Sequence, residues 1–141
     1  MAGVSFDWPI RIYYEDTDAG GVVYHSQYLN FMERARTEWL RSLGFAHSHL
    51  KDELGLIFVV RSAHIQFKKP AKFDDVLIVQ SRLQACKQCM LVFNQQTFRN
   101  SDHANDELLI DAEIEVVCVD ALNFKPTRLP QNIKNALAVA L

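Results

Sequence analysis

One long amphipathic helix, set between one strand and a run of four, is the feature that most limits how this chain can fold. Apolar side chains recur every three or four residues from Ser26 to Leu43, which is the spacing of a buried helix face, and Gly44 then ends the pattern. Ser26 is a residue type that favours a helix N-cap. A helix of this kind needs cover on most sides, so the rest of the chain is expected to wrap around it.

Strand-forming residues lie on both sides of this helix. Ile10–Tyr14 predicts a first strand, and stretches rich in Val, Ile, Leu and Phe predict four more, at Leu56–Lys69, Asp75–Cys86, Cys89–Arg99 and Leu108–Ala121. Connections such as Pro70–Asp74 and Asn100–Glu107 have hairpin length and favour an antiparallel meander. Short helices are predicted at Ser48–Leu54 and in the tail after Pro130, through Ala136 to Leu141. The predicted fold class is α+β, with a five-stranded antiparallel sheet around one long helix.

Composition limits the classes of function. A chain of 141 residues, 49% of them hydrophobic, suits one domain over residues 1–141 with a core of its own. Its 15 basic and 17 acidic residues give a net charge of −2, so no overall positive field attracts nucleic acid or anionic lipid. The longest apolar run, Leu54–Val60, is too short to span a membrane, and Met1–Ile10 lacks the features of a secretory signal. We expect a cytoplasmic protein without a transmembrane segment.

Cysteine and histidine spacings give little support for a metal site. Cys86, Cys89 and Cys118 are an odd number in a chain too large to depend on disulfides, and we expect free thiols. Cys86 and Cys89 have the spacing of half a zinc site, but no second pair of ligands follows in the sequence. No metal and no cofactor is predicted. The sequence also lacks a Gly-x-Ser-x-Gly elbow, a phosphate loop and a dinucleotide fingerprint, which excludes serine hydrolases, nucleotide hydrolases and dehydrogenases.

The segment Tyr14–His25 holds the densest cluster of reactive side chains. It carries three carboxylates, two phenols and an imidazole around a glycine pair, directly before the long helix. A helix N-terminus offers unpaired N–H groups and a partial positive charge, so an oxyanion near Tyr24 or His25 would find donors. An ionised Asp close by can activate water or attack an acyl carbon. The same residue types also form ordinary turns and helix caps, and both interpretations stay open on composition alone.

Motifs in this segment and beyond it carry a resemblance to a known family. They are Tyr14–His25, Tyr28-Leu29, Glu33–Glu38, Phe58–Arg61, Pro70-Ala71, Asp74-Asp75, Val117–Asp120, Lys125-Pro126 and Leu129-Pro130. In these positions the chain resembles the hotdog-fold acyl-CoA thioesterases of the 4-hydroxybenzoyl-CoA thioesterase-like class, and more narrowly the Tol-Pal system-associated acyl-CoA thioesterases. The resemblance implies a hotdog fold, hydrolysis of an acyl-CoA thioester to a free acid and coenzyme A, and a homo-oligomer, dimer or tetramer, with active sites at the subunit interface.

The resemblance also implies roles for individual residues. Asp18 matches the essential carboxylate of the family, as general base or nucleophile. The thioester carbonyl is implied to point at the backbone N–H of His25, which with the Tyr24 N–H is the predicted oxyanion site. The side chains of Tyr14 and His25 are implied to assist Asp18 by orienting it or a water molecule, whereas Glu15 and Asp16 are expected to be structural.

Substrate contacts outside this segment are predicted from charge and hydrophobicity. Coenzyme A carries phosphates, and the available cations are Arg61, Lys68, Lys69, Lys72, Lys125 and Arg128. A charged strand end that prevents aggregation explains Lys68–Lys72 equally well. Phe58–Val60, beside the helix face with Tyr28, either lines an acyl channel or packs in the core.

Two further functions stay open on the sequence. The first is a non-catalytic hotdog module that binds acyl-CoA or acyl carrier protein, which would not require Asp18. The second is a hotdog dehydratase, for which His25 and Glu33 are a poor substitute for the residues needed. Acyl carrier protein as a substrate carrier, and a peripheral position at the inner membrane, are likewise left open.

Overall fold

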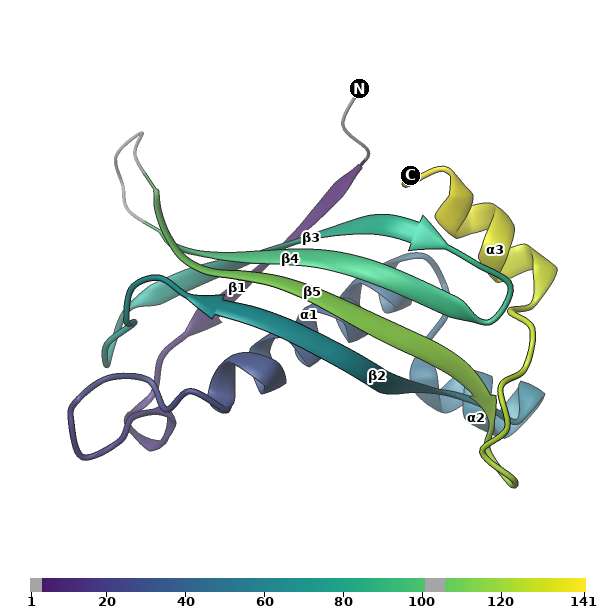
Figure 1. Cartoon of the computed structure of the whole chain (residues 1–141), viewed down its shortest axis with the longest axis horizontal. Coiled ribbons are helices and arrows are strands. Elements are labelled where there is room, and N and C mark those ends of the chain that lie inside the picture. The colour runs from purple at the N-terminus through teal and green to yellow at the C-terminus, as the bar shows by residue number, and fades with distance from the viewer. Residues whose placement is uncertain (1–3, 101–105) are drawn as a thin grey trace.

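The structure is a computed structural model that describes residues 4–100 and 106–141, and it has the expected hotdog arrangement (Figure 1). Its elements in chain order are β1 (Ser5–Arg11), the 3-10 helix η1 (Tyr14–Asp16), α1 (Gln27–Ser42), α2 (His47–Leu54), β2 (Leu56–Phe67), β3 (Val76–Cys86), β4 (Met90–Arg99), β5 (Glu107–Asp120) and α3 (Gln131–Ala138). The five strands form one antiparallel sheet, and α1 lies along one of its faces. The predicted α+β class is confirmed.

The strand order across the sheet is β1-β3-β4-β5-β2. Strands β3, β4 and β5 form the expected meander, with Cys86 opposite Leu91 and Arg99 opposite Glu107. The prediction that Pro70–Asp74 is a hairpin turn is wrong, because β2 pairs with β5 and β1 occupies the free edge of β3. The segment therefore crosses from one edge of the sheet to the other. Most of the predicted Asn100–Glu107 connection lies outside the described residues.

Two element boundaries differ from the predictions. The first strand was expected at Ile10–Tyr14 but runs over Ser5–Arg11, because the chain turns after it. The Asp16 carboxylate accepts a hydrogen bond from the Tyr13 N–H at 2.8 Å, and the Asp16 N–H donates to the Tyr13 carbonyl at 3.0 Å, so Tyr14 begins η1. The last helix begins at Gln131, directly after Pro130 as predicted, but it ends at Ala138 and not at Leu141.

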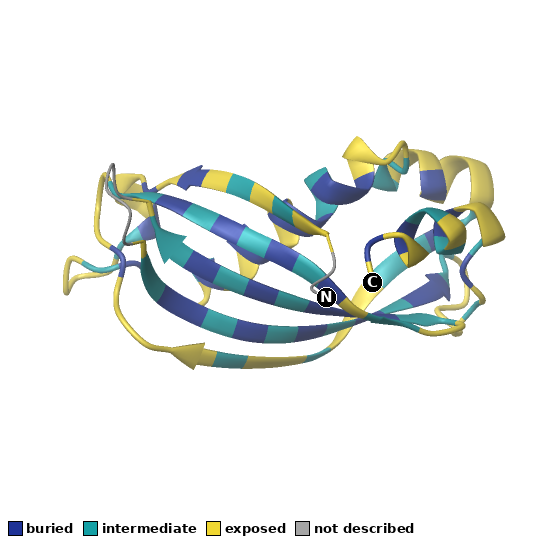
Figure 2. Cartoon of the chain, turned by 90° about the horizontal axis from the view of Figure 1, so that it is seen from above, coloured by how far each residue is buried: buried dark blue, intermediate teal, exposed yellow. Residues whose placement is uncertain are grey.

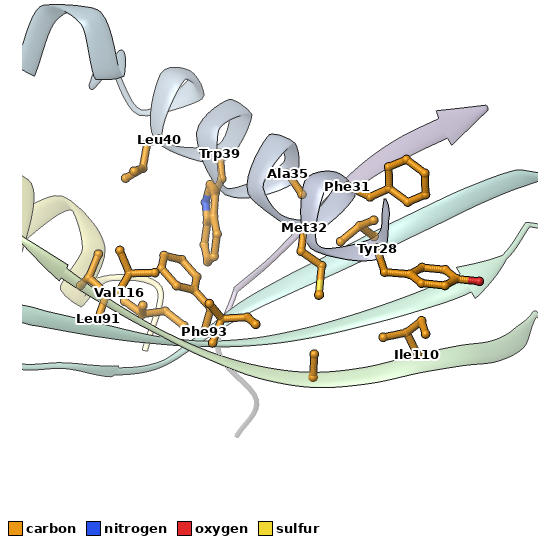
Figure 3. Close-up of a cluster of buried hydrophobic side chains, with 14 of the residues drawn as sticks. Tyr28, Phe31, Met32, Ala35, Trp39, Leu40, Leu91, Phe93, Ile110 and Val116 are labelled. Atoms are coloured by element: carbon orange, nitrogen blue, oxygen red, sulfur yellow. The ribbon is translucent and has the colours of Figure 1, made fainter. Parts of the chain in front are cut away.

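The core lies between α1 and the sheet (Figure 3). The buried face of α1 meets side chains from β4 and β5, and the labelled residues are Tyr28, Phe31, Met32, Ala35, Trp39, Leu40, Leu91, Phe93, Ile110 and Val116. The Trp39 ring stacks on Phe6 and meets Phe93 edge-on, with ring centroids 6.1 and 6.0 Å apart. These contacts fix the position of α1 over the sheet. The loop that leads into α1 is therefore fixed at its C-terminal end.

A buried polar group interrupts this core. The Arg36 guanidinium of α1 donates to the Gln95 side-chain oxygen at 2.9 Å, and the Gln95 amide donates to the Met32 carbonyl and the Ser81 hydroxyl at 3.0 and 2.9 Å. Gln95 is fully buried and Arg36 almost so. Because each buried polar group has a partner, the cluster ties α1 to β3 and β4 in one register.

The two edge strands differ in how they are protected. Figure 2 shows exposed residues gathered on the edge strands, whereas the inner strands alternate buried with partly buried residues. Strand β1 is short, contains Pro9 and carries Asp7 and Arg11, all features that discourage further pairing. Strand β2 has 12 residues with Arg61 as its one Lys, Arg, Asp or Glu, and it exposes Val60 and Phe67 by 51% and 53%. Its free edge is therefore open to another strand.

Candidate active site

Asp18 begins a tight turn in the loop that precedes α1. The Gly21 N–H donates to the Asp18 carbonyl at 3.0 Å, and the Asp18 N–H donates to the Val22 carbonyl at 2.9 Å. The Asp18 Oδ1 accepts the Gly20 N–H at 2.8 Å, which leaves Oδ2 without a partner in the described part of the chain. The side chain is exposed. The turn therefore presents one carboxylate oxygen to solvent while the other is held by the backbone.

The glycine pair is required by this geometry. Gly21 has φ +79°, a left-handed conformation that an L side chain rarely adopts, and a Cβ on Gly20 would lie 3.2 Å from Asp18 Oδ1. Bridges Thr17–Val23 and Val22–Lys72 then tie the turn to the start of α1 and to the crossing segment. The two glycines thus allow the turn in which the Gly20 N–H donates to the Asp18 carboxylate.

The backbone at the start of α1 corrects one part of the predicted oxyanion site. The Tyr24 N–H donates to the Asp16 carbonyl at 2.9 Å, and the Gln27 N–H donates to the Tyr24 carbonyl at 2.9 Å. The N–H groups of His25 and Ser26 have no partner among residues 4–100 and 106–141. Because the Tyr24 N–H is already paired, the predicted oxyanion site is left with the His25 N–H, and the Ser26 N–H, for which no role in that site was predicted, is a further unpaired donor next to it in the chain.

A pocket of about 290 Å³ opens beside His25. Its walls come from the loop, from α1 and from the end of β2: Val23, His25, Tyr28, Phe67, Lys68, Lys69 and Pro70. The Phe67 ring meets those of Tyr28 and His25 edge-on, with centroids 5.9 and 6.5 Å apart. The pocket therefore combines aromatic side chains with two lysines. The Asp18 turn comes shortly before the pocket residue Val23 in the sequence.

Tyr28 and Phe67 are two of the pocket residues that were not named as site residues from the sequence. The Tyr28 hydroxyl accepts the Ala71 N–H at 3.1 Å, and burial raises the pKa of this phenol, so it stays protonated and free to donate. Helical spacing had predicted Tyr28 as a core residue, which it also is. Phe67 lies at the end of a strand, and its position beside His25 depends on the non-local sheet pairing.

Tyr14 lies apart from this pocket. Its ring is 81% exposed and meets Phe73 edge-on at 5.9 Å. It lines a different hollow of about 400 Å³ together with Arg11, Tyr13 and Asp74. The loop that carries Tyr14 is the one that carries Asp18, but the two side chains do not share a pocket in this chain.

Three of the predicted cations lie together at the site. Lys68 and Lys69 line the His25 pocket, and Lys72 pairs through its backbone with Val22 of the Asp18 turn. The Lys69 ammonium is 3.0 Å from the Glu107 carboxylate, and this contact lowers the pKa of Glu107. Lys68 and Lys72 have no ion pair within the described ranges. Their charges are therefore the ones open to an anion.

The other three predicted cations lie elsewhere. Arg61 contacts Glu115 at 3.8 Å and the Met90 sulfur at 3.6 Å, on the sheet face opposite α1. Lys125 and Arg128 follow β5, where the Asp120 N–H donates to the Lys125 carbonyl and the Ala121 N–H to that of Gly55. This is the end of the sheet where β2 begins, far from the His25 pocket where β2 ends. One chain alone does not assemble the six cations.

Asp16, the cysteines and the helices can be compared with what the sequence suggested. Asp16 is buried and caps η1 through the Tyr13 N–H, in agreement with its expected structural role. Cys86, Cys89 and Cys118 are free thiols, and the described residues contain no group of three His, Cys, Asp or Glu side chains able to hold a metal. None of the described helices combines the length and apolarity needed to cross a membrane.

Comparison with known proteins identifies the family. The family described as the thioesterase-like superfamily matches residues 13–137 of this chain. The chain belongs to this superfamily. The acyl-CoA thioesterase YbgC of Haemophilus influenzae is 44% identical to this superfamily member over 136 residues, covering 96% of each chain. The acyl-CoA thioester hydrolase YbgC of Escherichia coli O6:H1 is 47% identical over 128 residues, covering 91% of this chain and 92% of that one.

Solved structures of the superfamily share the fold. A probable thioesterase from Bartonella henselae superposes with a TM-score of 0.83 at 34% identity, covering 90% of this chain and all of the other. The 4-hydroxybenzoyl-CoA thioesterase of Pseudomonas sp. strain CBS-3 superposes with a TM-score of 0.86 at 19% identity, covering 94% and 98% of the two chains. The second similarity, at such low identity, concerns the fold alone.

Proposed function

We propose that residues 1–141 form one hotdog thioesterase domain that hydrolyses acyl-CoA thioesters, with Asp18 as the catalytic carboxylate. The observation that carries this proposal is the pairing of a backbone-held Asp18 with two unpaired N–H groups, those of His25 and Ser26, beside a pocket. A binding module would need neither. The YbgC relatives, named as acyl-CoA thioesterases, support the same reaction class.

The reaction assigns separate tasks to these groups. The thioester carbonyl oxygen accepts the His25 and Ser26 N–H groups, which stabilise the charge that develops on it together with the partial positive end of α1. Asp18 Oδ2 either takes a proton from water as the water attacks the carbonyl carbon, or attacks that carbon itself to form an anhydride that water then cleaves. The C–S bond breaks in both routes, and the sulfur takes up a proton as coenzyme A leaves.

The proposed assembly is a homodimer in which β2 of one subunit pairs antiparallel with β2 of the other. The free edge of β2 is long and apolar, and such edges pair readily. Full overlap of the two strands about their midpoint sets Arg61 opposite Ser62, so no like charges meet. A tetramer requires a further surface, for which these contacts give no argument.

This dimer would reunite the predicted cations. Antiparallel overlap brings the start of β2 in one subunit next to the end of β2 in the other, so that Lys125 and Arg128 of the partner subunit approach the pocket of Lys68 and Lys72. We propose that these cations bind the phosphates of coenzyme A, and that active sites therefore lie at the subunit interface. The assisting roles of Tyr14 and the His25 ring stay proposals as well.

The test is Asp18→Asn, which keeps the acceptor for the Gly20 N–H but removes the charge. Release of coenzyme A thiol, measured across short, long and aromatic acyl-CoAs, should fall at least about a hundredfold, as expected for loss of a general base. Glu15→Gln, an exposed carboxylate of the same loop, is the matched control and should retain activity. Unchanged turnover in Asp18→Asn, with the fold intact, would sink the assignment.

Cellular context forms a second set of proposals. We propose a cytoplasmic enzyme related in role to the Tol-Pal system-associated thioesterases that the sequence resembles. Recovery in the soluble fraction of lysed cells tests the location, and a membrane fraction that survives mild salt washing would favour the peripheral alternative. The rate of hydrolysis of an acyl group on acyl carrier protein, compared with the rate for the same acyl group on coenzyme A, tests whether acyl carrier protein is also a substrate carrier.

A further inference from the structure

A second pocket, of about 220 Å³, lies between α2 and the first residues of β2. Its walls are largely apolar, from Leu50, Leu56, Ile57 and Phe58, with His47, Ser48 and Lys51 among them. An apolar pocket with few polar groups is the usual form of a small-molecule site. Neither the catalytic turn nor the proposed phosphate contacts use it.

His47 supplies the polar group of this pocket. Its Nδ1 lies 3.4 Å from the Thr37 hydroxyl and its ring centroid lies 5.8 Å from that of Phe58, so the ring is held on both sides. The opposite nitrogen, Nε2, is buried and has no hydrogen-bond partner within residues 4–100 and 106–141. A buried nitrogen without a partner is costly, and a ligand in the pocket that pairs with it after the side chains covering it shift recovers that cost.

A hydroxyl is the polar group that can pair with Nε2 in either tautomer of a neutral ring. Burial lowers the pKa of His47, helped by Arg36 and Arg41 and opposed by Glu33, so the imidazole is neutral at pH 7. A neutral ring presents either an N–H or a lone pair at Nε2, and a hydroxyl can accept from the first or donate to the second. A hydroxyl therefore satisfies His47 in either tautomer.

Within one chain this pocket is too far from the His25 pocket to hold the same ligand. Phe58 lines the first and Phe67 the second, and nine strand residues span about 30 Å. Both rings face α1, since Phe58 packs against the core and Phe67 meets Tyr28. In the proposed dimer, full overlap of the two β2 strands sets Leu56 opposite Phe67, with the strands about 4.8 Å apart. The two pockets then adjoin across the interface.

We propose that His47 of the partner subunit binds a hydroxyl at the far end of the acyl group, which makes His47 a specificity-determining residue supplied in trans. The inference rests on the proposed function and its β2–β2 dimer. An apolar cavity of about 150 Å³ holds benzene, so this pocket has room for a hydroxylated ring or for the end of a short hydroxylated chain. Both share the same chemistry, an acyl group that ends in a hydroxyl.

The first experiment measures a ratio of kcat/KM values. Hydroxybenzoyl-CoA is compared with benzoyl-CoA, and ω-hydroxyhexanoyl-CoA with hexanoyl-CoA, to separate ring from chain. His47→Phe should lower the hydroxylated-to-plain ratio of at least one pair by about five- to tenfold, the effect of one hydrogen bond. His47→Gln, which keeps a polar side chain, should restore part of it. His49→Phe, an exposed histidine on the same helix, is the control and should leave both ratios unchanged.

The second experiment tests whether His47 acts in trans. Subunits carrying Asp18→Asn and subunits carrying His47→Phe are co-expressed with different tags, and the mixed dimer is isolated by both. Its one active site combines Asp18 from the His47→Phe subunit with His47 from the other, so the wild-type ratio should return. A mixed dimer with the low ratio of His47→Phe would place His47 in cis and overturn the inference.

Other results would also overturn it. Equal ratios in wild type and His47→Phe would show that His47 does not bind the hydroxyl. Faster turnover of succinyl-CoA than of either hydroxylated substrate would indicate that the pocket binds a carboxylate through Lys51 instead. If Asp18→Asn is fully active, the proposed function fails. If Asp18→Asn is inactive but His47→Phe has the same hydroxylated-to-plain ratios as wild type, only the role of His47 fails.

Discussion

The buried cluster of Arg36, Gln95 and Ser81 allows a sharp test of what holds α1 on the sheet. Gln95→Leu keeps the size of the side chain but removes the acceptor for the Arg36 guanidinium and both donors of the amide. The charge-assisted bond is worth about 1.5–3 kcal/mol and each neutral bond about 1 kcal/mol. Burial of the new apolar group returns about 1–2 kcal/mol. The net loss in the free energy of unfolding should be about 3 kcal/mol.

A second variant distinguishes loss of the Arg36–Gln95 hydrogen bond from a simple loss of packing. Burial lowers the pKa of Arg36 to about 10, which indicates that the charge is poorly solvated where it lies. Removing that charge as well, in Arg36→Met with Gln95→Leu, should recover part of the loss, with a coupling energy of at least about 1.5 kcal/mol.

Urea unfolding followed by circular dichroism measures all four members of this cycle. Gln96→Leu, on the outer face of the same strand, is the control and should change the stability by less than about 0.5 kcal/mol. A loss below about 1 kcal/mol for Gln95→Leu, or a double variant whose loss equals the sum of the singles, would refute the reasoning.

Two other predictions concern the sheet edge and a buried thiol. Val60→Lys should weaken the proposed dimer at least about tenfold in sedimentation, because a charge then stands opposite Ala63 of the partner subunit in an otherwise apolar seam, whereas Asp7→Lys on the β1 edge should leave it intact. A wild-type protein that sediments as a monomer contradicts this. Burial raises the pKa of Cys118 from 9.0 to about 11, so the stability from its neutral thiol is complete below pH 9 and is lost as the pH rises to about 11. Cys118→Ala should show a smaller decline than wild type over that window in melting experiments, and equal declines would exclude the thiol as the cause.

Local patterns predicted local structure well. The spacing of Tyr28, Phe31, Met32 and Trp39 predicted α1 to within a residue or two, and the glycine pair predicted the turn at Asp18. These features depend on neighbours in the chain, so the sequence records them directly.

Features that depend on distant partners were missed or misassigned. No local signal shows that β2 pairs with β5 rather than β3, and the wrong hairpin at Pro70–Asp74 followed from that. The same pairing sends Lys125 and Arg128 to the far end of the sheet from Lys68. The Tyr24 N–H is paired with the Asp16 carbonyl, a contact across the loop that no local pattern in the sequence shows.

The crossing segment from Lys68 to Asp75 makes the site depend on both edges of the sheet. It leaves the β2 edge with two lysines, gives Ala71 O to the Val23 N–H at 2.9 Å, and reaches the opposite edge where Asp75 O accepts the Ile12 N–H at 2.9 Å. Arg99 fastens it on the way, to Asp75 at 3.1 Å. The loop of Asp18 is anchored to a strap whose two ends belong to opposite edges of the sheet. Activity should therefore return on refolding only after both edges have assembled, which makes hydrolysis a reporter of the whole width of the sheet.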